Sequence, residues 1–169
     1  MGERKTKWVA LAYVTALAVI YASGIDCTDY ALCGTFSLSR HLLYHHFHAS
    51  IWHLLCNAWC LLTIVFMWNT SLAKLCTAYI IASTYPYELF STQPTVGISG
   101  LIYVLVGMYS LSPSTAKGKI RYNAYVLLTM SVGLLMPMIS VGVHIYCYIA
   151  GCIIALLNYP FFHYKQKQL

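Results

Sequence analysis

Charged residues are scarce in this sequence. Ten basic and four acidic residues in 169 make up 8% of the chain, while 60% of the residues are hydrophobic. This composition excludes an ordinary soluble domain and predicts an integral membrane protein. The apolar runs and their short connections use nearly every residue, so no room remains for a separate soluble domain. We therefore expect a single membrane domain over residues 1–169.

Acidic side chains are absent from the apolar runs. Asp26, Asp29 and Glu88 all lie in expected loops, so no carboxylate is available inside the membrane as the third member of a catalytic triad. The first apolar run also lacks the small-x-small cleavage site that ends a signal peptide. The net charge of +6 follows from membrane topology, and we expect no nucleic-acid partner.

The apolar runs predict an all-α polytopic membrane protein, a bundle of six transmembrane helices. The third run is the shortest of the six. The expected spans are Trp8 to Ser23, Ala49 to Trp68, Leu75 to Tyr85, Gly97 to Leu111, Tyr122 to Met136 and Val141 to Asn158.

The basic residues predict the orientation of these spans. All of them except Arg40 lie at the two termini or in the second and fourth loops. Basic residues accumulate on the cytoplasmic side of a membrane protein, so both termini are expected to be cytoplasmic. The expected location is the cell membrane, the inner membrane of a bacterium, with the lipid bilayer as the surrounding medium.

Polar side chains recur near the starts of the second, fourth and sixth spans, all of which begin at the outer face. His53 and Asn57 lie on the second span, Ser99 on the fourth and His144 on the sixth. At about 1.5 Å per residue these four side chains reach one level, on the order of 10 Å below the outer surface. Polar groups at such depth need partners or a function.

Spacing predicts which of these side chains face each other. His53 and Asn57 are four residues apart, as are Ser99 and Tyr103, so each pair shares a helix face. Small residues permit close approach of the fourth and sixth spans, which would bring His144 within hydrogen-bond reach of Ser99. These small residues are Gly100 and Gly107 on the fourth span, and Cys147, Gly151 and Ala155 on the sixth.

A serine beside a neutral imidazole in an apolar pocket is an activated nucleophile. We therefore predict a dyad of Ser99 and His144, with Tyr103 stacked on the imidazole. Hydrogen-bond donors would hold the oxyanion of the intermediate. The candidates are His53, Asn57 and the backbone N–H of Ser99 at a helix start.

The motifs His48-x4-His53-x3-Asn57, Gly97-x-Ser99-Gly100-x2-Tyr103 and His144-x6-Gly151 stand in this order on six spans. Together they resemble the rhomboid family of intramembrane serine proteases over essentially the whole chain. The resemblance implies Ser99 as nucleophile, His144 as base, and His53 with Asn57 at the oxyanion. It also implies that Tyr103 packs on His144, with His48 bracing the adjacent loop.

The same resemblance implies an endopeptidase that cuts single-span transmembrane proteins near the external membrane face, without a cofactor. Met136, Pro137 and Met138 would form a cap over the site, and the fifth span would be the gate past which substrate enters. Two features depart from the family pattern: the first loop is short and has no Trp-Arg pair, and Cys147 stands where many members have glycine.

Other readings of the same residues exist. A buried membrane histidine or asparagine can be purely structural, and His41, His45, His46 and His48 could form a metal site, although we expect none. Cys27 and Cys33 share a loop and could form a disulfide. The alternative functions are a non-catalytic bundle that binds transmembrane segments, and a haem or metal protein with histidine ligands. Neither of them requires a Gly-x-Ser-Gly motif together with His144.

Overall fold

The computed structural model describes residues 2–90, 93–134 and 140–166, with side chains described for residues 4–89, 93–131 and 140–158. The regular secondary structure of this part of the chain is helical, as predicted, and the described residues contain no strand. Its longer helices are α1 (Gly2–Ala22), α3 (Ile51–Met67), α4 (Leu72–Ala82), α6 (Ser99–Met108), α7 (Ala116–Leu134) and α8 (Val141–Gln166). Its short helices are η1 (Cys27–Tyr30), α2 (Leu38–Leu43), η2 (Tyr44–His46) and α5 (Tyr87–Phe90).

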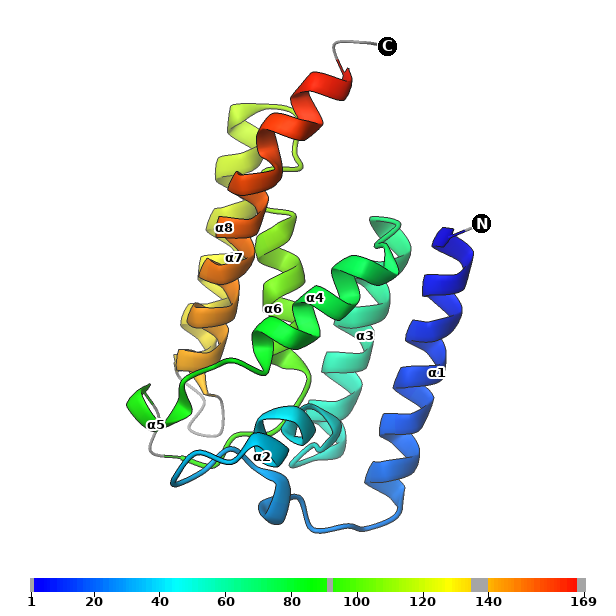
Figure 1. Cartoon of the computed structure of the whole chain (residues 1–169), viewed down its shortest axis with the longest axis vertical. Helices are drawn as coiled ribbons and strands as arrows, with labels where there is room; N and C mark the ends of the chain where they lie inside the picture. The colour runs from blue at the N-terminus through cyan, green and yellow to red at the C-terminus, as the bar shows by residue number, and fades with distance from the viewer. Residues whose placement is uncertain (1, 91–92, 135–139, 167–169) are drawn as a thin grey trace.

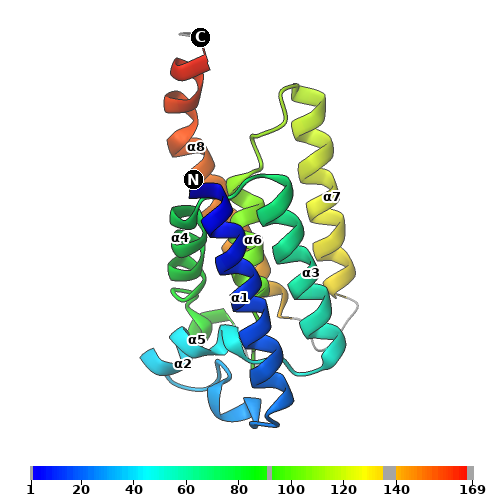
Figure 2. The ribbon, with the colours of Figure 1, turned by 90° about the vertical axis from the view of Figure 1, so that its right-hand side faces the viewer.

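Helix α6 is the central element of the bundle. It packs most extensively against α8, and also against α4 and α3, while α1 lies on α3 and α7 lies on α8. The N-terminus of α1 and the C-terminal end of α8 lie at one end of the bundle, and α2 and α5 lie at the other (Figures 1 and 2). We call these the terminal end and the loop end.

Local sequence signals set the helix boundaries. Ser50 and Ser71 cap α3 and α4, because their hydroxyls accept the backbone N–H groups of His53 and Lys74. Helix α1 ends before Gly24, which has a φ of +70°, a value that glycine adopts without strain. The turn between α3 and α4 uses Asn69 at a φ of +46°.

The longer helices occur at the six expected positions, but several are shorter than a membrane span. By length and apolar composition, only α8 among the described helices can cross a bilayer alone, over Val141–Asn158. Leu38–His46 and Ile51–Met67 pass the same test together, with a bend of 86° between them. The number of six spans therefore stays a prediction.

The contact between α6 and α8 brings two backbones together. A Cβ atom added to Gly151 would lie 2.9 Å from the Cα of Gly107 and would overlap the carbonyl oxygen of Val104. A Cβ atom on Gly107 would lie 2.8 Å from the backbone nitrogen of Cys152. Only glycine fits at either position, because the obstructing atoms belong to the backbone. The stripe of small residues on α8 therefore faces α6, as the sequence predicts.

This contact makes Gly151→Ala a strong test of the packing. We expect the substitution to destabilise the protein by about 1–3 kcal/mol, the usual cost of overpacking a core. Thermal unfolding in mild detergent would measure the loss. The control is Gly118→Ala near the exposed start of α7, where the nearest atoms are the side chains of Thr115 and Pro113 at 3.0 and 3.1 Å. Equal unfolding temperatures for both variants would contradict the close contact.

Candidate active site

Ser99 is the first residue of α6, directly after a segment that the loop end holds in place. Thr95 and Leu32 exchange backbone hydrogen bonds of 3.0 and 2.9 Å, and the Gly97 N–H donates to the Tyr44 carbonyl oxygen at 2.9 Å. Gly97 has a φ of +113°, which an L-residue rarely adopts. The start of α6 is thus tied to the loop between α1 and α3. Ser99, at this helix start, is half-buried.

His53 and Asn57 of α3 both face Gly97. A Cβ atom on Gly97 would lie 2.9 Å from His53 Nε2 and 3.4 Å from Asn57 Nδ2. Asn57 is buried, and its Nδ2 has no hydrogen-bond partner among the described residues. A buried donor without an acceptor is unfavourable unless a ligand or water supplies one. The space beside the Gly97–Ser99 backbone is therefore bordered by two side chains able to donate hydrogen bonds.

His144 lies in the first turn of α8 and is buried, with 8% of its surface exposed. Its ring stacks on that of Tyr103, with centroids 4.3 Å apart and planes inclined by 29°. One turn away, Gly100 accommodates Val143 and Cys147, whose atoms lie 3.1 and 3.3 Å from the position of a Cβ on the glycine. The turn of α6 that carries Ser99 therefore meets the turn of α8 that carries His144.

The hydrogen bond expected between Ser99 and His144 is not formed within the described part of the chain. The two residues are brought to adjoining turns, but the serine hydroxyl does not contact the imidazole with hydrogen-bond geometry. Such bonds are often long or misaligned without substrate and shorten when substrate binds. Rotation of the Ser99 side chain is the smallest change that could bring its hydroxyl closer to the His144 imidazole.

His48 lies behind His53. The two rings meet edge to face at 5.1 Å, and neither ring nitrogen of His48 has a hydrogen-bond partner among the described residues. Burial lowers the pKa of the His48 imidazole to about 3, and the neighbouring His53 adds to this effect. The imidazole is therefore neutral at physiological pH, and its ring packs on that of His53.

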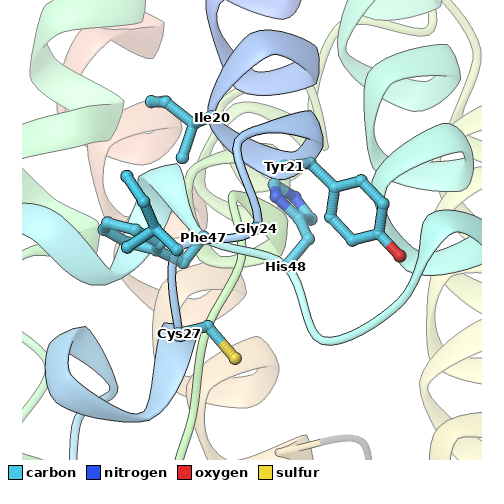
Figure 3. Close-up of a pocket in the computed structure, with 7 residues that line it drawn as sticks. Ile20, Tyr21, Gly24, Cys27, Phe47 and His48 are labelled. Atoms are coloured by element: carbon cyan, nitrogen blue, oxygen red, sulfur yellow. The ribbon is translucent and has the colours of Figure 1, made fainter.

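A cavity of about 270 Å³ lies at the loop end, between the end of α1 and the segment of Phe47 and His48 (Figure 3). Ser99, His53 and His144 do not line this cavity, so it is distinct from the site that these three residues form. The residues that line it are Ile20, Tyr21, Gly24, Ile25, Cys27, Phe47 and His48.

The other histidines of the loop hold it against α4 and α5. His41 contacts the Ser83 carbonyl oxygen through Nδ1 at 2.9 Å, and a carboxylate oxygen of Glu88 through Nε2 at 3.2 Å. The Nε2 atom of His45 lies 3.0 Å from the Ser83 hydroxyl. These histidines therefore attach the loop to the end of α4. Cys27 and Cys33 carry free thiols in this arrangement.

Tyr44 is a residue of the site that sequence reasoning missed. It is fully buried, its carbonyl oxygen accepts the Gly97 N–H, and its hydroxyl donates to the Ala82 carbonyl oxygen at 3.0 Å. The same hydroxyl lies 3.1 Å from the position of a Cβ on Gly100. Its sequence context, a tyrosine among loop histidines, carries no signal of this role. The cap residues Met136 and Met138 lie outside the described residues.

The geometry defines a class of protein: a helical bundle in which a serine at a helix start adjoins a buried histidine, an imidazole, and an amide that has no hydrogen-bond partner among the described residues. The sequence model of the Rhomboid domain matches residues 35–161, about three quarters of the chain. The chain therefore belongs to the rhomboid family. Members of this family are in general intramembrane serine proteases that act on transmembrane substrates. Comparison with curated proteins finds no match.

The loop histidines predict an acid-sensitive fold. Burial lowers the pKa of His45 from 6.5 to about 3, so below pH 6.5 the unfolded chain binds a proton that the folded chain does not. Stability should fall as pH falls from 6.5 toward 3, by about 1.4 kcal/mol per pH unit for this residue. His45→Phe should flatten the dependence of unfolding temperature on pH. His46→Phe, at a half-buried ring, should flatten it less, and equal slopes in all three proteins would contradict the prediction.

Proposed function

We propose that this chain is an intramembrane serine endopeptidase that uses Ser99 as nucleophile and His144 as general base. The observation that carries the proposal is the buried Asn57 amide, whose Nδ2 has no hydrogen-bond partner among the described residues and which with His53 faces the Gly97 backbone two residues before Ser99. A serine protease needs donors at this position, because the negative charge of the intermediate develops next to the nucleophile. A purely structural asparagine would have its amide paired.

The chemistry follows from the roles of these groups. The Ser99 hydroxyl attacks the substrate carbonyl carbon while its proton passes to a His144 nitrogen, and the carbonyl oxygen becomes an oxyanion. Asn57 Nδ2, His53 and the Ser99 N–H stabilise that oxyanion. The intermediate collapses to an acyl-enzyme as His144 gives its proton to the leaving amine. Water, deprotonated by His144, then hydrolyses the ester and regenerates Ser99.

Tyr103 and the loop end would act by positioning. The stacked tyrosine restricts rotation of the His144 imidazole, so the orientation of its ring nitrogens is held. Tyr44 and the Thr95–Leu32 pair hold the segment that leads into Ser99. A displacement of about 1 Å at a reacting group can reduce rate about 100-fold, so this support matters for catalysis.

The proposed topology is a single domain of six spans with both termini in the cytoplasm and the loop end outside. The first turns of α6 and α8 then lie near the external face, and the cut falls in the outer part of a substrate span. A transmembrane helix must unwind locally before its peptide bond can reach Ser99. Substrates with glycine, proline or small polar residues near that end should open at lower cost.

The dyad is tested by Ser99→Ala and His144→Ala with a single-span model substrate. Each should abolish cleavage without loss of folding, and the double variant should be no worse than either, because the two groups act as a unit. A fluorophosphonate should label the wild-type protein at Ser99 alone, and product masses should place the cut in the external half of the span. Labelling that persists in Ser99→Ala, or a cut in the cytoplasmic half, would reject the assignment.

The oxyanion role of the donors is tested by Asn57→Ala. Removing one such donor should lower kcat about 100- to 1,000-fold with KM little changed, because the lost bond forms only in the transition state. Single-turnover and steady-state rates separate the two constants. The matched control is Asn123→Ala on α7, which is not among the residues proposed to hold the oxyanion. If KM rises while kcat is kept, Asn57 binds substrate and the oxyanion role is wrong.

A further inference from the structure

A second cavity lies at the terminal end of the bundle, away from Ser99. Its volume is about 650 Å³, within the range of small-molecule sites. The start of α4, the end of α6 with its following loop, the first turns of α7 and the middle of α8 all contribute to its walls. Among the residues that line it are Lys74, Tyr109, Ser112, Lys119, Ile154 and Asn158.

The cavity exists because two helices are short. Helices α4 and α6 have 11 and 10 residues, about 16 and 15 Å, against about 30 Å for the apolar core of a bilayer. Helix α8 has 26 residues and continues past both toward the terminal end (Figure 1). The recess therefore lies beyond the ends of α4 and α6, alongside the part of α8 that continues past them.

The charge of the cavity has one sign. Lys74 and Lys119 both line it, and none of the described residues in its wall is acidic. The Lys74 ammonium is half-buried and lies 4.3 Å from the centroid of the Tyr109 ring. Ser112, Thr77 and Asn158 add neutral polar groups. Two ammonium groups with nearby hydroxyl and amide groups form a suitable environment for a phosphate diester.

The surroundings favour a lipid as the source of that phosphate. Met108, Leu111 and Ile154 form an apolar part of the wall, and the adjoining face of α8 exposes Ile153, Leu156 and Leu157 by 51–69%. An acyl chain can lie along this face while its phosphate occupies the cavity that both lysines line. Basic pockets between membrane helices on the cytoplasmic side bind anionic headgroups in this way.

We propose that this cavity binds the phosphate headgroup of an anionic phospholipid, held by Lys74 and Lys119. The site lies at the opposite end of the bundle from Ser99. It rests on the proposed membrane topology but not on the proposed catalysis, since binding is measured directly. The bound lipid would fill the recess that the short α4 and α6 leave and would stabilise their ends against α8.

The experiment compares binding of short-chain phosphatidylglycerol, phosphatidylcholine and soluble glycerol phosphate to delipidated protein by native mass spectrometry, with unfolding temperature as a second measurement. Phosphatidylglycerol should bind and stabilise the wild-type protein. Lys74→Gln and Lys119→Gln should each weaken binding about fivefold, and their combination about 25-fold. Lys74→Arg with Lys119→Arg should retain it, because the charge is kept.

The matched control is Lys5→Gln with Lys117→Gln, which removes the same charge from exposed residues at the same end of the bundle. This control should bind like the wild-type protein. Equal losses in both double variants would mean attraction to the basic surface and would overturn the site. No preference for phosphatidylglycerol over phosphatidylcholine would also overturn it. Equal affinity for glycerol phosphate would identify a free phosphate ester as the ligand and refute the lipid.

Discussion

The backbone contact between α6 and α8 at Gly107 and Gly151 is the constraint on which the rest of the structure depends. Helices that touch through glycine approach more closely than helices separated by side chains, and in a membrane such packing replaces the hydrophobic driving force. This approach sets the relative height of the two helices. It thereby stacks the ring of His144, two turns from Gly151, on the ring of Tyr103, one turn from Gly107. A different helix separation would leave each ring in lipid or in the core.

A second constraint operates at the loop end. The segment that enters α6 is held by backbone hydrogen bonds to Leu32 and Tyr44 and by the buried side chains of Thr95 and Ile98. The long loop is in turn attached to α4 and α5 through His41, His45 and Glu88. The position of Ser99 thus depends on residues more than fifty positions earlier in the chain. The glycine at 97 lets His53 and Asn57 approach the same segment from the other side.

Sequence reasoning was most successful where it relied on local rules. A helix start close to Ser99, the shared face of His53 and Asn57, and the small-residue face of α8 follow from helix periodicity and from glycine and serine signals, which act within a few residues. The predicted start at Gly97 lies two residues before the observed one. Sequence reasoning predicted the lengths of the helices less well. Apolar composition extends the fourth run to Leu111, whereas α6 ends at Met108, because the end of a helix also depends on what packs against it. The 86° bend before α3 and the role of Tyr44 had no local signal.

The sequence by itself determined that this protein is an all-helical membrane protein of the rhomboid family, because composition, order of motifs and helix spacing are properties of the chain alone. Only the tertiary structure decided which groups meet. The stacking of Tyr103 on His144, the unpaired amide of Asn57 beside Gly97 and the cavity around Lys74 all join residues from different helices. Such contacts depend on how closely and at what height the helices pack, and this is fixed by the sum of many weak side-chain contacts that no single motif encodes.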